Sequence, residues 1–239
     1  MLRPPFRLYF LFTAVFLIMH GTGVVAGQLP YIYNAMISFS VVLLALLVSE
    51  KWYSGKTYKK TIEDLGFHST PFSGIVPGII ISVALLLLYP VFGYFLNTEI
   101  ALHESWLPNL AGICLTGGLM EEMFFRGFLF RHLRESMTFR KAVFVSAMLF
   151  TAAHLLLFTY MDWAIALSST LLAVFMSVPL AWLFERGGYT VWSPAILHAT
   201  IRTIGLVVTT SEEHFMPLAL FWMLGGMVVP YLVLLFYSD

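Results

Sequence analysis

Residues 109–130 read NLAGICLTGGLMEEMFFRGFLF, and this stretch decides what kind of fold the chain adopts. As a helix rising about 1.5 Å per residue, it is long enough to cross the ~30 Å hydrocarbon core of a bilayer. It nevertheless contains Glu121, Glu122 and Arg126, and ionisable groups inside a membrane are costly and usually functional. The alternative is a purely structural cluster of paired polar groups. We favour function, because further ionisable residues occur in two other apolar segments.

The composition of the 239-residue chain also indicates a membrane protein. Apolar residues make up 59% of it and charged residues 11%, and the mean hydropathy is +0.86, unlike a soluble domain. Lipid offers backbone groups no hydrogen-bond partner, so spanning segments must be helical. We therefore predict an all-α polytopic protein, a single integral membrane domain over residues 1–239 with about eight transmembrane helices. The predicted segments are Leu8–Ala26, Tyr33–Val48, Ile75–Leu96, Asn109–Phe130, Ala142–Tyr160, Trp163–Phe184, Val191–Thr209 and Phe215–Tyr237.

Charge and cysteine content exclude several kinds of partner. The formal net charge is zero, and no basic stripe or glycine-rich phosphate loop occurs, so nothing indicates binding to a nucleic acid. Cys114 is the only cysteine and cannot form an internal disulfide. Any metal would therefore need histidine and carboxylate ligands.

Basic residues gather in alternate loops, which predicts the orientation of the chain. The Lys and Arg residues outside the spans are Arg3, Arg7, Lys51, Lys56, Lys59, Lys60, Arg131, Arg134, Arg140, Lys141 and Arg186. The opposite loops hold no Lys or Arg and carry instead the acidic residues Glu99, Glu104, Asp162, Glu212 and Glu213. We therefore expect a multi-pass protein with both termini in the cytoplasm, in the plasma membrane of a prokaryote.

Two histidines and a second arginine inside spans join the charges of residues 109–130. Helix geometry puts Glu121, His154 and His198 at a common depth between the midplane and the cytoplasmic face. His198 and Arg202 are spaced i,i+4, as are Phe150 and His154, so each pair presents one helix face. These residues are predicted to form one intramembrane site.

The spacing within residues 121–126 assigns separate roles to the two glutamates. Glu122 and Arg126 are spaced i,i+4, which predicts an ion pair. Glu121 projects about 100 degrees around the helix and is left for another partner. Glu121 is therefore the candidate general base or acid. The structural alternative is that both glutamates simply bond Arg126.

Three motifs in this order resemble the CPBP family of CAAX proteases and bacteriocin-processing enzymes, also called Abi. Residues 121–127 (EEMFFRG) match its EExxxR motif and the glycine that usually follows, and residues 150–154 (FTAAH) match FxxxH. His198 lies where the third motif of the family, HxxxN or HxxxD, begins. The resemblance covers residues 75–209, which we expect to be the catalytic core.

The resemblance implies an intramembrane endopeptidase with a peptide or membrane-protein substrate in the lipid bilayer. It implies that Glu121 and His154 activate a water molecule and that His198 binds the oxyanion. We favour a glutamate mechanism without a metal, because no HExxH motif is present. A zinc ion held by the same three residues is the alternative. The residues expected to support the site are Glu122, Arg126, Phe150 and Arg202.

Arg202 stands where the family motif has Asn or Asp, which puts activity in doubt. It could donate a charge-assisted hydrogen bond to the oxyanion, or it could pair with a glutamate and disable the base. We favour the donor role, because Arg126 already supplies a neutralising charge. A catalytically impaired membrane scaffold or peptide-binding protein of the same fold is the first alternative function, and a transporter is the second.

Overall fold

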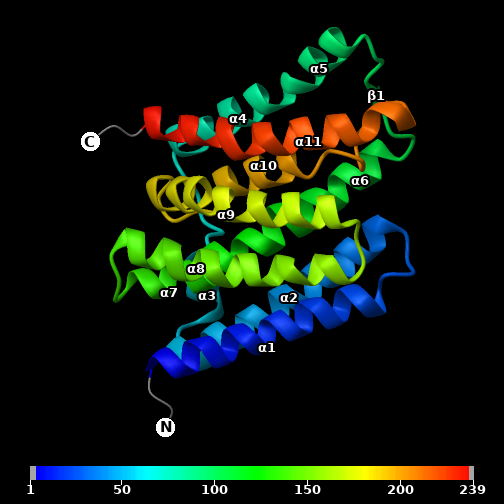
Figure 1. Cartoon of the computed structure of the whole chain (residues 1–239). Coiled ribbons are helices and arrows are strands. Elements are labelled where there is room, and N and C mark those ends of the chain that lie inside the picture. The colour runs from blue at the N-terminus through cyan, green and yellow to red at the C-terminus, as the bar shows by residue number, and fades with distance from the viewer. Residues whose placement is uncertain (1–3, 237–239) are drawn as a thin grey trace.

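The computed structural model describes residues 4–236, which form a bundle of helices and confirm the predicted all-α class (Figure 1). Within these residues the only strands are two short ones, paired antiparallel. In chain order the elements are α1 (Pro4–Val25), α2 (Tyr31–Ser54), α3 (Tyr58–Asp64), α4 (Phe72–Leu86), α5 (Leu88–Leu96), β1 (Ala101–Leu102), α6 (Trp106–Ile113), η1 (Cys114–Met120), η2 (Met123–Phe130), α7 (Arg131–Arg134), α8 (Phe139–His154), η3 (Leu155–Thr159), α9 (Trp163–Arg186), α10 (Trp192–Ile201), β2 (Val208–Thr209), α11 (Glu212–Val228) and η4 (Val229–Leu235).

Six helices among the described residues are long and apolar enough to cross a membrane. They correspond to six of the eight predicted segments. Their bounds are Phe6–Val25, Tyr31–Ser54, Phe72–Leu96, Phe139–Thr159, Trp163–Arg186 and Glu212–Leu235. The chain is therefore a multi-pass membrane protein, and the remaining two predicted segments differ from simple spans.

The fourth predicted segment, 109–130, lies inside one uninterrupted helical run from α6 to α7. Two stretches of this run, η1 and η2, are π-helical, and they flank Glu121 and Glu122. A π-helical stretch widens the helix locally and often occurs at a functional site. The two glutamates therefore lie between the two irregular stretches of the central helix.

The seventh predicted segment, 191–209, is wrong as a single spanning helix. Helix α10 has 10 residues, about 15 Å of rise, which is half of a hydrocarbon core. The chain then turns at Gly205, whose φ of 74° is left-handed, and continues as β2, which pairs with β1. This apolar segment therefore consists of a short helix, a turn and a strand, which its composition alone does not reveal.

The helices are stacked in layers, as Figure 1 shows. Helices α1 and α2 form one side, the central run and α8 lie next to them, and α4, α5 and α11 form the other side. Helix α10 lies inside the bundle and packs against α4, α9 and η1. One apolar core surrounds η2, and a second joins α10 to α4, α9 and α11.

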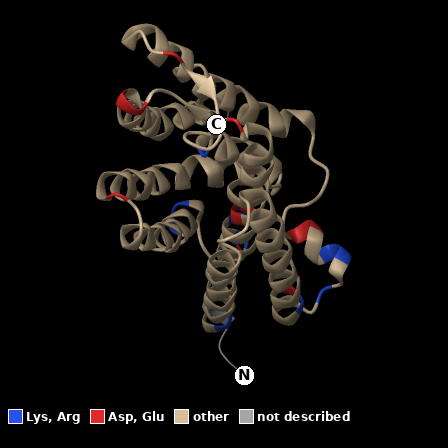
Figure 2. Ribbon diagram, turned by 90° about the vertical axis from the view of Figure 1, so that its right-hand side faces the viewer, with Lys and Arg blue, Asp and Glu red and all other residues tan. Residues whose placement is uncertain are grey.

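The chain enters and leaves the bundle at one end. In Figure 1, α1 begins and η4 ends at the left, where α3 and α7 also lie. Figure 2 shows that Lys, Arg, Asp and Glu are concentrated at helix ends and loops, with few along the helices. This distribution fits a bundle whose sides face lipid.

Gly127, the glycine after the first motif, allows a backbone to pass close to η2. A Cβ atom on it would collide with the carbonyl oxygen of Leu65 and would lie 2.8 Å from the carbonyl carbon. Leu65 follows α3 and is fully buried, so this backbone has little freedom to move away. Gly127 thus fixes the loop after α3 against the helix that carries the glutamates.

We predict that Gly127→Ala lowers the melting temperature of the purified protein by several degrees, because overpacking costs about 1–3 kcal/mol. Gly21→Ala is the matched control, since it also lies in a helix and its Cβ would meet nothing within 4 Å. Thermal unfolding in detergent measures both variants. Equal melting temperatures for the two variants would contradict the close approach.

Candidate active site

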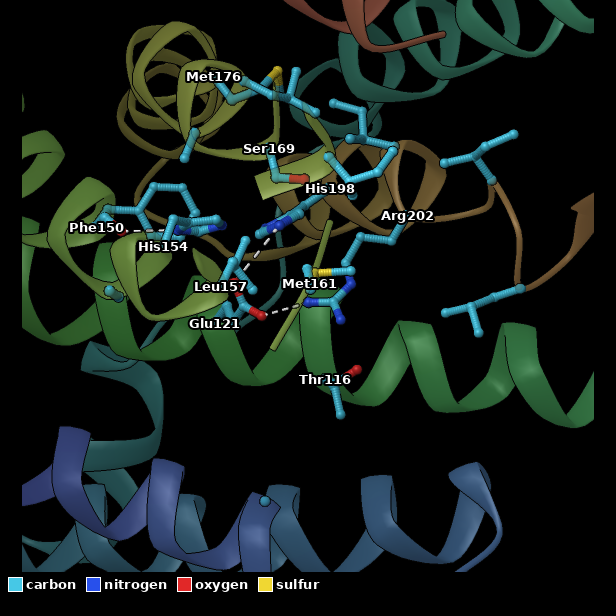
Figure 3. Close-up of a pocket in the computed structure, with 18 of the residues that line it drawn as sticks. Thr116, Glu121, Phe150, His154, Leu157, Met161, Ser169, Met176, His198 and Arg202 are labelled. Atoms are coloured by element: carbon cyan, nitrogen blue, oxygen red, sulfur yellow. Dashed lines mark hydrogen bonds and ion pairs between the residues drawn. The ribbon is translucent and has the colours of Figure 1, made fainter. Parts of the chain in front are cut away.

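Three helical segments bring five of the seven predicted site residues to one cavity of about 970 Å³ (Figure 3). The central run supplies Glu121, α8 supplies Phe150 and His154, and α10 with its C-terminal cap supplies His198 and Arg202. Most of the other side chains that line the cavity are apolar. The few polar groups are therefore held in a largely apolar chamber, as in many binding and catalytic sites.

Glu122 holds the site together from behind the cavity. Its Oε1 accepts a hydrogen bond from Arg126 Nη1 at 3.1 Å and another from His198 Nδ1 at 2.7 Å. The Glu122 side chain is completely buried, and that of Arg126 is 4% exposed. The predicted i,i+4 ion pair is thus present, and one carboxylate oxygen also binds the central helix to α10. Since His198 donates through Nδ1, its Nε2 is the ring nitrogen that remains for the cavity.

Glu121 faces the cavity between two cationic or potentially cationic groups (Figure 3). Arg202 Nη1 donates to Glu121 Oε1 at 2.7 Å, and His198 Nε2 lies 3.7 Å from Glu121 Oε2. The first contact is a charge-assisted hydrogen bond, while the second is too long for a direct hydrogen bond. Arg202 therefore binds the candidate base, which is the contact expected of the pairing alternative rather than of the favoured donor role.

His154 ends α8 with a defined ring orientation. Its Nδ1 donates to the carbonyl oxygen of Phe150 at 2.9 Å, because a carbonyl only accepts. The ring of Phe150 packs edge-on against His154, with 4.7 Å between centroids, and lies 6.0 Å from the ring of His198. Phe150 also lies beneath the guanidinium of Arg126, at 4.8 Å. The Nε2 atom of a neutral His154 is therefore an acceptor on the cavity side.

His154 and Glu121 line the same cavity from two different helical segments. Among the described residues no hydrogen bond joins them, and the structure places each beside the open space. A water molecule in that space is the species that could contact both. The arrangement supplies a carboxylate, an imidazole acceptor and a second imidazole, which suits acid–base chemistry on a water.

Gly117 is a site residue that the sequence reasoning missed. A Cβ atom on it would overlap Cδ of Arg202 and would lie 3.0 Å from Nε. Gly117 lies one helical turn before Glu121. Because it has no side chain, the Arg202 side chain can lie directly against the central helix at this position. The signal was the pair Gly117-Gly118 inside an apolar segment, since small residues in membrane helices often mark close approaches.

A group of polar residues on α1, α2 and η1 was also missed. The polar members of the cavity lining from these elements are His20, Tyr31, Asn34, Ser38 and Thr116. The Tyr31 hydroxyl bonds Thr116 Oγ1 at 3.0 Å, and Ser38 donates to Asn34 at 3.1 Å. None of these residues belongs to a charged motif, so only their shared cavity reveals them.

The alternative zinc set does not assemble in the residues that the structure describes. No three His, Cys, Asp or Glu side chains there form a group that could hold a metal ion. The Glu121 carboxylate, which the zinc alternative requires, instead binds the Arg202 guanidinium. These side chains as arranged do not fit a zinc ion.

Part of the chain matches a known protein family. Residues 103–204 match the family described as type II CAAX prenyl endopeptidase, Rce1-like. The matched residues include all seven of the predicted site positions and lie within the predicted core, 75–209. A search of curated proteins finds no match.

We predict that Glu122→Ala destabilises the fold by about 3–5 kcal/mol, because it leaves the buried Arg126 charge and His198 without their shared acceptor. Thermal unfolding in lipid nanodiscs measures the loss. Glu104→Ala, at an exposed glutamate, is the control and should leave the melting temperature unchanged. A Glu122→Ala protein as stable as this control would show that the shared acceptor contributes nothing to folding.

Proposed function

Because residues 103–204 form a domain of the Rce1-like CAAX prenyl endopeptidase family, we propose that the protein is an intramembrane endopeptidase. Its substrate would be a peptide or a membrane-associated protein, and the reaction would be hydrolysis of a peptide bond by an activated water. The observation that supports this most strongly is the convergence of Glu121, His154 and His198, from three helical segments, on one cavity. A cavity lined mostly by apolar side chains strengthens each polar interaction within it.

In the proposed reaction, a water molecule lies between Glu121 and His154. Glu121 takes a proton from the water while the water oxygen attacks the carbonyl carbon of the scissile bond, and His154 Nε2 orients the water. The carbonyl electrons move to its oxygen, and this oxyanion accepts a hydrogen bond from His198 Nε2 when that ring is doubly protonated. Glu121 then gives the proton to the leaving nitrogen as the C–N bond breaks. The products are a carboxylic acid and an amine.

Turnover requires Glu121 to leave Arg202. While the guanidinium binds Oε1, the carboxylate is neutralised and one of its acceptor positions is filled. The same contact favours a second candidate function, a membrane scaffold or peptide-binding protein with a disabled site. A catalytic protein and a scaffold then differ in whether Arg202 can be displaced.

The proposed topology has eight crossings with both termini in the cytoplasm. The central run would be one crossing, and α10 together with residues 202–209 would be another, since β2 pairs with β1, the strand just before α6. Irregular backbone at membrane depth is tolerated where it is buried in protein or lines a water-filled cavity. Arg202, Ile204 and Leu206 of this irregular stretch line the cavity, which supports the proposal.

We predict that Glu121→Gln and His154→Ala each lower peptide cleavage by ~100-fold or more, because each removes part of the water-activating pair. The measurement is release of fluorescent fragments from a library of quenched peptides by the protein in liposomes. Both variants should stay folded: His154→Ala should keep the wild-type melting profile, whereas Glu121→Gln, which loses the contact with Arg202, should melt at a somewhat lower temperature. Glu104→Gln serves as the control for activity.

Full cleavage by either variant would reject the assigned roles. Failure of the wild-type protein to cleave any library peptide would instead favour the scaffold.

A further inference from the structure

Arg202 and Glu121 are the only Lys, Arg, Asp or Glu residues among the described side chains that line the cavity. The cavity is thus a mostly apolar chamber that holds one ion pair. Neither charge can leave the other without cost, because a single unpaired charge in a low-dielectric site is strongly unfavourable. Any molecule that separates the pair must therefore supply a replacement charge.

Arg202 has more hydrogen-bonding capacity than Glu121 uses. A guanidinium carries five N–H donors, and the structure gives the Arg202 side chain one hydrogen bond, from Nη1 to Glu121. Its side chain is 36% exposed, whereas that of Glu121 is 14% exposed. The remaining donors therefore have access to the open part of the cavity.

Arg202 also lies outside the regular part of its helix. It caps the end of α10 at the start of an irregular stretch, and its side chain fills the space that Gly117 leaves free. Glu121, in contrast, is part of a continuous helix packed in the bundle. Of the two partners, the guanidinium is the one able to turn toward a new anion.

We propose that Arg202 binds a carboxylate of the peptide substrate, and that this exchange releases Glu121 to act on water. The inference rests on the proposed function and makes Arg202 a specificity-determining residue. A substrate carboxylate matches the planar guanidinium in a two-point contact and replaces the charge that Glu121 loses. A neutral peptide offers no such replacement, so the base stays bound in its presence.

The carboxylate could belong to the C-terminus of the peptide or to an acidic side chain. Both present the same chemistry to Arg202, and peptides distinguish them directly. The first pair is one short apolar peptide made with a free C-terminal carboxylate and with a C-terminal amide. The second pair is the amidated peptide with an internal glutamate or an internal glutamine.

The test compares kcat/KM for these peptides with wild-type protein, Arg202→Asn and the exposed control Arg140→Asn, all in neutral lipid. We expect wild type and Arg140→Asn to prefer a carboxylate peptide over its neutral partner by ~10-fold or more. Arg202→Asn should lose this preference, with a ratio near one, and should cleave the neutral peptide faster than wild type does. Gly117→Ala, which displaces Arg202 without changing charge, should reduce the preference in the same direction.

A binding measurement separates this inference from the proteolytic activity. In Glu121→Gln, which lacks the base and leaves Arg202 unpaired, the carboxylate peptides should raise the melting temperature more than their neutral partners do. Adding Arg202→Asn to Glu121→Gln should abolish the difference. If the carboxylate peptides stabilise Glu121→Gln in this way but the wild-type protein cleaves no peptide, the proposed protease activity is rejected and the carboxylate-binding site is retained.

The inference is overturned if Arg202→Asn keeps the wild-type preference for carboxylate peptides. It is also overturned if carboxylate and neutral peptides stabilise Glu121→Gln equally. A preference confined to one peptide pair would identify the source of the carboxylate, C-terminal or side-chain, and would support the inference.

Discussion

The requirement that every charge inside the membrane has a partner organises this protein. The Oε1 atom of Glu122 accepts from Arg126 within its own helix and from His198 on α10. This one oxygen therefore joins two helices far apart in sequence and sets the rotation of the His198 ring. Because Glu122 is completely buried, the contacts gain strength from the low dielectric and become costly to lose.

Irregular backbone surrounds this network on both sides. Two π-helical stretches flank the glutamates, and α10 ends at Ile201, just before Arg202. Here the widened central helix and the short α10 bring charged side chains to one largely apolar cavity (Figure 3).

The fold class and most of the site could be predicted from the sequence, because they depend on local spacing and on the cost of burying charge. The i,i+4 pair of Glu122 and Arg126 is such a case. The end of α10 could not be predicted, since residues 191–209 remain apolar through the turn and only the pairing of β1 with β2 reveals it. Whether Arg202 is a free donor or pairs with Glu121 also could not be predicted. It depends on the close approach of α10 to η1, which the missing side chain of Gly117 permits.

The ion pair between Arg202 and Glu121 decides whether the Glu121 carboxylate is free to act as a base. A double-mutant cycle measures it directly: the unfolding free energies of wild type, Glu121→Gln, Arg202→Asn and the double variant are compared in one lipid. We predict that the sum of the two single losses exceeds the loss in the double variant by about 1 kcal/mol or more, as for groups in direct contact. Losses that add within ~0.3–0.5 kcal/mol would contradict it, because they would show that the two charges do not interact in the folded protein.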